Sequence, residues 1–204
     1  LRERLHAAER EVDSLTAKSA ALGSALAISG GAAEIVKTGG AGIRGLVGDA
    51  VQVRAGFEAA IAAVLGSLAE GVLVDRASDA FALANEAAEQ RRGVVDFVVA
   101  DALRPTVDLP SLEGVTPAID TVTAPDGVLG ILSHVLIADD LDAARTARRA
   151  LDATGDTTTT IVTTGGDVIT AQTLRTGSGG ERSRLELAAE RDAANDRLAE
   201  VQVI

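Results

Sequence analysis

The sequence predicts a mixed α/β domain that is built from two related halves and flanked by an antiparallel coiled coil. Apolar residues recur with heptad spacing at both ends, and glycine-rich joints separate these ends from the middle. Within the middle, one order of segments occurs twice. We therefore expect an N-terminal arm over residues 1–36, a globular domain over residues 37–180 and a C-terminal arm over residues 181–204.

Both arms are predicted by spacing. The N-terminal seam alternates between steps of four and three residues, which favours a coiled coil over a plain amphipathic surface helix; it comprises Leu1, Leu5, Ala8, Val12, Leu15, Ser19, Leu22 and Leu26. The C-terminal seam is interrupted by Arg191 and comprises Leu187, Ala194, Leu198 and Val201. Short helices are marginal in water when they have no partner, so we expect these two to pair antiparallel.

The first half of the globular domain alternates between strand and helix patterns. Its expected elements are strands at residues 51–53, 71–74 and 94–99, a helix from Phe57 to Leu68, and a helix from a Ser78 cap to about Arg92. A loop with several prolines follows over residues 101–117.

The second half repeats this order, and we place the halves at about residues 41–116 and 117–180. Its elements are a helix end at residues 128–132, a buried strand at 135–137, a helix capped by Asp139 or Asp140, a strand at 157–163 and a Gly165–Gly166 hairpin. Chance similarity between Val- and Leu-rich segments is the alternative. The matching order of elements favours a true repeat.

The composition limits the function. The chain is 47% hydrophobic and has only three aromatic residues, all Phe, so it lacks stacking platforms for single-stranded nucleic acid. A net charge of -11 argues against attraction of the whole surface to DNA. The absence of Cys excludes disulfides and cysteine zinc sites, and we expect a cytoplasmic protein. No apolar run is long enough to span a membrane, and the absence of Met indicates a piece of a longer protein.

One glycine-rich loop, Gly40–Gly45, matches the dinucleotide fingerprint G-x-G-x-x-G. That motif needs a strand before it and a helix after it, so that pyrophosphate lies at the helix N-terminus. Here the loop follows the end of an arm and precedes a loop and a strand, which argues against a cofactor. A small nucleotide- or ligand-binding domain that uses this loop is the alternative function.

Other polar residues are predicted to be structural. His6 and His134 have neither a Ser or Cys partner nor metal-ligand spacing. The acids at strand-to-helix turns are expected to cap helices; they are Asp75, Asp79, Asp139, Asp140 and Asp142. Arg145, Arg148 and Arg149 are expected on the solvated face of one helix. We therefore predict no catalytic residue, no metal site and no cofactor.

Two features point to binding instead. Segment 157–180 consists of β-formers and glycines that suit pairing with another backbone. Four basic residues lie at the two joints, where a local patch could hold phosphates although ordinary ion pairs are the alternative; they are Lys37, Arg175, Arg182 and Arg184.

The whole order of segments resembles the hinge of structural maintenance of chromosomes (SMC) proteins. In the first half the matching segments are GLVGD at 45–49, VQV at 51–53 and FEAAIAAVLGSLAEGVLVD at 57–75. In the second half they are VLGILSHVLIADDLDAARTAR at 128–148 and VTTGGDVITAQTLRTGSGG at 162–180. The family's glycine pattern falls on Gly166 and Gly177, whereas Thr173 and Ser178 depart from it.

This resemblance implies a homodimerisation hinge of a bacterial chromosome condensation and segregation ATPase, located at the nucleoid. The partner would be a second copy, with contacts at Gly165, Gly166, Gly177, Ile161 and Val162. Weak DNA binding would fall at the hinge–arm junction, on Lys37, Arg175, Arg182 and Arg184. ATP binding and kleisin-type subunits are implied only for the full-length parent, and the chain itself is expected to be non-catalytic.

Overall fold

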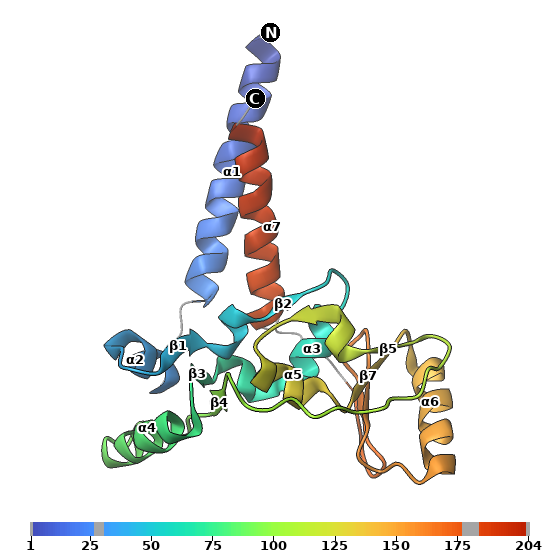
Figure 1. The fold of residues 1–204 in the computed structure, drawn as a ribbon. Helices are drawn as coiled ribbons and strands as arrows, with labels where there is room; N and C mark the ends of the chain where they lie inside the picture. Colours follow the sequence, from blue (N-terminus) through green and yellow to red (C-terminus); the bar gives the residue numbers. More distant parts are fainter. Residues whose placement is uncertain (1, 27–30, 177–183, 203–204) are drawn as a thin grey trace.

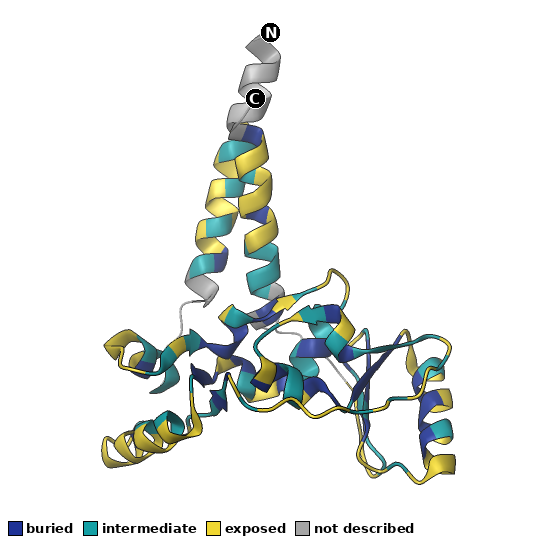
Figure 2. Cartoon of the chain, viewed as in Figure 1, coloured by how far each residue is buried: buried dark blue, intermediate teal, exposed yellow. Residues whose placement is uncertain are grey.

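The computed structural model describes residues 2–26, 31–176 and 184–202 (Figure 1). Helices α1 (Arg2–Leu26) and α7 (Arg184–Gln202) lie side by side and antiparallel, and the pair projects from a globular domain. Where side chains are described, the facing sides are buried or partly buried and the outer sides are exposed (Figure 2), as the heptad spacing predicts. Polar contacts of 2.7–2.9 Å cross between the described parts of the helices, among them Ser19 to Asn195, Lys18 to Glu190, and Arg197 to Glu11.

The N-terminal arm ends earlier than residue 36. Helix α1 stops at Leu26, residues 27–30 lie outside the described chain, and α2 (Gly31–Thr38) belongs to the globular domain. Ile35 of α2 is buried among residues of the first sheet. Gly31 permits this packing, because a Cβ there would lie only 2.5 Å from the carbonyl oxygen of Arg92.

The two halves have the same order of elements. The first comprises β1 (Ile43–Leu46), η1 (Val47–Ala50), β2 (Gln52–Val53), α3 (Glu58–Leu65), η2 (Gly66–Glu70), β3 (Val72–Val74), α4 (Ala77–Glu89) and β4 (Phe97–Val99). The second comprises β5 (Val115–Pro117), η3 (Ala118–Thr121), β6 (Val122–Thr123), α5 (Asp126–Leu132), β7 (Val135–Ala138), α6 (Leu141–Thr154) and β8 (Thr160–Thr163), and is extended by β9 (Val168–Ile169) and β10 (Leu174–Arg175).

Strand pairing repeats as well. Strand β1 is antiparallel to β3, which is parallel to β4; likewise β5 is antiparallel to β7, which is parallel to β8. The sheets have the orders β1-β3-β4 and β10-β9-β8-β7-β5, and the short β2–β6 ladder joins the halves. The sequence repeat is therefore a structural repeat. Its second copy begins with β5 at Val115, slightly before the predicted boundary.

The central strands β3 and β7 are buried on both faces, which explains their continuous apolar runs. The inner faces share one core with α3 and α5; it includes Leu73, Val98, Val135, Ile137 and Val162. On the outer faces, α2 and α4 cover the first sheet, and α6 covers part of the second.

Helix starts agree only in part with the prediction. Asp140 caps α6, because its Oδ1 accepts a hydrogen bond from the Ala143 N–H at 2.8 Å. Ser78 does not cap α4, which begins one residue earlier. Instead, Asp79 Oδ2 accepts a hydrogen bond from the backbone N–H of Arg76 at 3.2 Å. The strand expected from Val94 begins only at Phe97.

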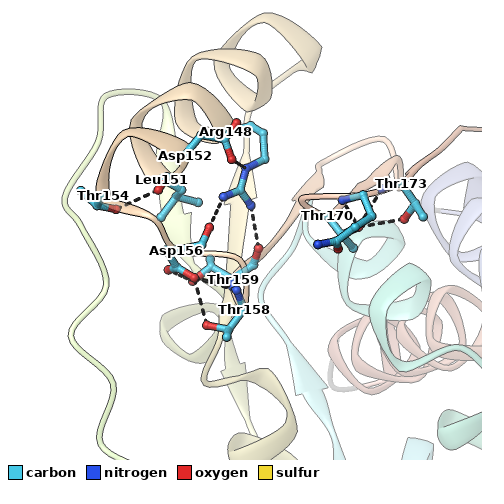
Figure 3. Close-up of polar contacts among 10 residues, drawn as sticks. Arg148, Leu151, Asp152, Thr154, Asp156, Thr158, Thr159, Thr170 and Thr173 are labelled. Carbon is cyan, nitrogen blue, oxygen red and sulfur yellow. Dashed lines mark hydrogen bonds and ion pairs between the residues drawn. The ribbon is translucent and has the colours of Figure 1, made fainter.

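Arg148 is buried, contrary to the solvated helix face that we predicted (Figure 3). Its Nε lies 2.8 Å from Asp152, its Nη1 donates to the Thr159 carbonyl at 3.1 Å, and its Nη2 donates to the Asp156 carbonyl. Because a guanidinium can make several hydrogen bonds at once, Arg148 ties the end of α6 to the loop before β8.

The Asp156 carboxylate holds the same loop (Figure 3). It accepts hydrogen bonds from the Thr159 hydroxyl at 2.5 Å and from the Thr158 N–H at 2.8 Å. The Thr159 hydroxyl bond, followed by the backbone N–H bonds, holds the pKa of Asp156 well below its ordinary value. A carboxyl with a lowered folded-state pKa stabilises the protein above its unfolded pKa of about 3.9, and this contribution is lost as pH falls below that value.

We therefore expect Asp156→Asn to lower the free energy of unfolding by about 1–2 kcal/mol at pH 7, where the charged acceptor contributes fully. The difference in the free energy of unfolding between the wild type and the variant should become smaller between pH 4 and pH 3. Urea unfolding of both proteins at each pH measures this difference, and a difference independent of pH would contradict a lowered pKa of Asp156.

Candidate dimer interface

The outer strands of the two sheets are not equivalent. Strand β1 has an irregular register between Ile43 and Gly45, and β5 ends in Pro117, which has no N–H to offer. Such features make an edge a poor template for further pairing. Among the described residues, β4 and β10 also have a strand on one side only, and neither carries a bulge or a proline.

The structural repeat indicates which strand the open side of β4 can accept. In the first sheet β4 occupies the place that β8 occupies in the second. Strand β8 accepts β9 on its outer side in antiparallel register, with Ile161 opposite Ile169 and Val162 opposite Val168. The backbone of β4 therefore has a side without a strand neighbour, although the Val99 carbonyl at its end already accepts the Ala102 N–H and lies against Gly127 of α5.

Strand β10 lies at the far edge of the second sheet. Its Leu174 stands opposite Ile169 of β9 and is 61% exposed. The hydrogen bond from Thr170 N–H to the Thr173 carbonyl marks that pair as hydrogen-bonded, so the backbone groups of the next residue, Leu174, face away from β9. Arg175 anchors the strand from the other face, because its Nη2 donates to the Ala63 carbonyl of α3 at 2.7 Å.

Exposed apolar side chains gather around these two edges. Val94 and Leu103, which precede and follow β4, are 96% and 97% exposed. Leu174 of β10 and the half-exposed Leu141 of α6 line one groove. Phe81 lies on α4, the helix that packs on β3 and β4, and is 73% exposed. Large apolar groups concentrated beside open strand edges are typical of a protein–protein contact.

Of the residues predicted to contact a partner, the structure places two in an interior strand and two in a turn. Ile161 and Val162 are fully buried in β8, which is interior because β9 folds back and pairs with it. Gly165 and Gly166 form the β8–β9 turn, with Gly166 at φ +89°. Gly177 lies outside the described residues. Partner contact by the glycines stays a prediction, whereas Ile161 and Val162 have no side-chain surface to offer.

Thr173 stands where the family pattern has glycine, and its hydroxyl has a local role (Figure 3). The hydroxyl oxygens of Thr170 and Thr173 lie 2.9 Å apart, and Thr170 Oγ1 also accepts the Thr173 N–H at 2.9 Å. These side-chain contacts close the turn between β9 and β10. Ser178, the other departure from the pattern, lies outside the described chain.

The four predicted junction cations do not form one described patch. Lys37 is exposed at the end of α2, on the first sheet, whereas Arg175 belongs to β10 of the second. Arg182 lies outside the described residues. Arg184 begins α7, but the structure describes only its backbone. DNA contact at the junction stays a prediction.

The fingerprint loop does not fit a dinucleotide. It follows helix α2 and precedes strand β1, which reverses the order that the motif requires. At Gly42, with φ +83°, a Cβ would lie 2.6 Å from Asp79 Oδ2. A carboxylate therefore occupies the close approach that a phosphate would need.

The remaining polar residues form no reactive cluster within the described ranges. Asp75, predicted as a cap, instead pairs with Arg44, whose guanidinium also reaches Asp101 at 2.8 Å. His134 Nδ1 is buried without a partner in the described chain, and the side chain of His6 is not described. No group of three or more acids or histidines there could hold a metal ion. None of the described helices is both long and apolar enough to cross a bilayer.

Residues 40–148, more than half of the chain, match the family model for the SMC proteins Flexible Hinge Domain. The chain belongs to the SMC hinge family. Membership gives it the role of a hinge, not of an enzyme.

Two curated relatives agree with this membership. The chain is 35% identical over 199 residues to "Chromosome partition protein Smc" of Mycolicibacterium paratuberculosis, covering 94% of this chain and 16% of that protein. It is 33% identical over 213 residues to the protein of that name from Mycobacterium tuberculosis, covering 97% and 17%. The SMC hinge described here therefore spans about a sixth of the length of these bacterial relatives.

A solved structure supports the fold. The SMC hinge domain of Geobacillus stearothermophilus, crystallised as an asymmetric dimer, superposes with a TM-score of 0.80 at 22% identity. The superposition covers 98% of this chain and 87% of that one. The mixed helix-and-sheet fold predicted from the sequence is thus confirmed as that of an SMC hinge.

Thr173→Gly should restore the family's glycine at the cost of stability. We expect the free energy of unfolding to fall by about 1–2 kcal/mol, because the turn loses its hydroxyl contact and the unfolded chain gains freedom. The free energy of unfolding should fall much less in Thr173→Ser, which keeps the hydroxyl. Thermal unfolding of the three proteins measures this, and equal stability of the Gly and Ser variants would contradict the role of the hydroxyl.

The junction prediction can be tested on the chain itself. Replacing Lys37, Arg182 and Arg184 together by Glu should abolish a weak DNA affinity that falls steeply with added salt. Replacing the exposed Arg76, Arg91 and Arg104 together by Glu changes the net charge by the same amount away from the junction, and so controls for net charge alone. Fluorescence anisotropy with labelled duplex DNA provides the readout. Equal binding by the wild type and the triple variant would leave these residues as ordinary junction charges.

Proposed function

We propose that this chain is the homodimerisation hinge of a chromosome partition protein of the Smc type. In the dimer, β4 of one copy pairs antiparallel with β10 of the other, and a two-fold axis generates the same contact a second time. The observation that carries this proposal is that β4 and β10 each have a strand neighbour on one side only and carry neither a bulge nor a proline. A closed two-fold arrangement uses both edges of both copies and leaves neither open for further growth.

Pairing of strand edges supplies backbone hydrogen bonds, and the side chains beside the edges supply apolar burial. Val94 and Leu103 flank β4 and Leu174 lies on β10, so the pairing would draw these exposed groups toward a partner. The same contact explains why the chain tolerates large apolar residues at such exposed positions.

The arms leave the globular domain together on one side (Figure 1). Each copy in a dimer would therefore contribute one antiparallel arm, and the hinge would join two such arms. For the full-length protein we infer ATPase heads, kleisin-type partner subunits, a role in chromosome condensation and segregation and a place at the nucleoid. This inference is supported by the resemblance of the sequence to SMC hinges and by the relatives, which are chromosome partition proteins.

Leu174→Pro tests the strand pairing, because proline removes the outward N–H of β10 and leaves the bonds to β9 in place. We expect a dimer in the wild type and a dissociation constant raised about tenfold or more in the variant, since two hydrogen bonds of about 1 kcal/mol each are lost per dimer. Sedimentation equilibrium measures it.

The matched control is Leu174→Ala, which keeps the N–H and removes only the side chain, so it should weaken the dimer less than proline does. Circular dichroism checks that both variants keep their fold. A wild-type monomer at tens of micromolar, or an unweakened Leu174→Pro dimer, would contradict the proposal.

A further inference from the structure

The outer face of the second sheet carries an open apolar groove of about 390 Å³ between α6 and strands β9 and β10. Its apolar lining is provided by Leu141, Ala144, Ile169 and Leu174, and arginines including Arg145 and Arg149 form its rim. In the described chain, nothing covers Leu174, which is 61% exposed.

The groove exists because one helix cannot cover five strands. A helix with its side chains is about 10–12 Å wide, and strands are spaced by about 4.8 Å, so one helix covers roughly two or three strands. Helix α6 packs on β5, β7 and β8, and its side chains also bury Ile169 of β9. In the described chain the outer face is therefore left bare toward the edge strand β10, where Leu174 is exposed. The first sheet has two helices, α2 and α4, over only three strands.

We propose that α4 of a second copy covers the exposed β10 edge of this outer face, with Phe81 seated in the groove. This inference rests on the proposed dimer. Both α4 and α6 connect parallel strands, β3 to β4 and β7 to β8, and such crossovers are right-handed. When β4 of one copy pairs antiparallel with β10 of the other, this handedness places both helices on the same face of the joined sheet. Helix α4, which packs on β4, then lies next to the groove.

Phe81 is suited to be the anchor of this contact. It is 73% exposed, whereas the other aromatic residues, Phe57 and Phe97, are partly buried in this chain's own cores. An exposed aromatic ring opposite an apolar groove is the usual composition of an interface hot spot.

Charge supports the same pairing. Helix α4 carries exposed Glu89 and has no basic residue between Ala77 and Glu89, whereas its Glu86 lines the small pocket between α4 and α2. The groove rim on α6 carries exposed Arg145 and Arg149, and Asp142 beside them pairs with Arg145 at 2.7 Å, so the rim is basic on balance. The acidic helix of one copy would therefore face the basic rim of the other, which selects this orientation of the two helices.

A charge exchange tests the docking. One variant carries Arg145→Glu with Arg149→Glu, and a second carries Asn85→Arg with Glu89→Arg, two exposed positions of α4. Each variant alone would place like charges at both helix contacts of its dimer, so we expect its dissociation constant to rise at least about tenfold at low salt. A heterodimer of the two variants restores opposite charges at both contacts. Native mass spectrometry of the mixture should show heterodimers in excess of the statistical half.

A cysteine pair provides an independent readout, because the chain has no Cys of its own. Phe81→Cys with Leu174→Cys should give a covalent dimer under mild oxidation. Ala82→Cys with Leu174→Cys, which moves the thiol by one helix position, should cross-link less. Phe81→Ala should weaken the dimer at least about tenfold, and Phe81→Leu should weaken it less.

The outcomes separate the two proposals. A dimer with a statistical mixture of the charge variants, no cross-link and full affinity for Phe81→Ala would overturn the groove contact and leave the strand-paired dimer intact. A wild-type chain that is monomeric at all concentrations would overturn the dimer, and the groove contact with it.

Discussion

The N–H and C=O groups at the edge of a sheet must be hydrogen-bonded to another strand, protected from such pairing by a bulge or a proline, or hydrated. This constraint applies to both halves of the molecule. The register irregularity in β1 and the terminal Pro117 of β5 blunt two edges. Strand β9 covers the outer side of β8. Only the open sides of β4 and β10 are left in the two larger sheets of the described chain, and the proposed dimer is the arrangement that uses both.

The same repeat that makes the halves alike also makes their differences informative. The second half adds β9 and β10 but no second helix, so its outer face is left partly bare where the first half is fully covered. It also has the buried Arg148, which binds the end of α6 to the loop before β8. The second half thus has both a rigid internal connection and an incomplete surface, a combination suited to receiving a partner.

The arm is attached unequally to the globular domain. Leu185, at the start of α7, is buried in the core that the two sheets share, and α7 also contacts α3, β2 and the short helices. Helix α1 packs mainly on α7, and the chain then reaches the first sheet through α2. Movement of the arm is therefore coupled to the centre of the domain chiefly through α7.

Local patterns in the sequence determined the paired helical ends, the long helices, the buried strands, the repeat, the β8–β9 hairpin and the Asp140 cap, because each depends on residues close together in the chain. They did not show the short strands β1, β5, β6 and β10, and β5 lies within the segment predicted to be a loop. The tertiary structure decided which strands are interior. Apolar runs show that Ile161 and Val162 are buried, but not that β9 pairs with β8 beside them. The tertiary structure also buries Arg148 and places Lys37 and Arg175 on different sheets. It leaves Phe81 and Leu174 exposed. Neighbours in a sheet are set by contacts between segments distant in sequence, and periodicity along one segment carries no information about them.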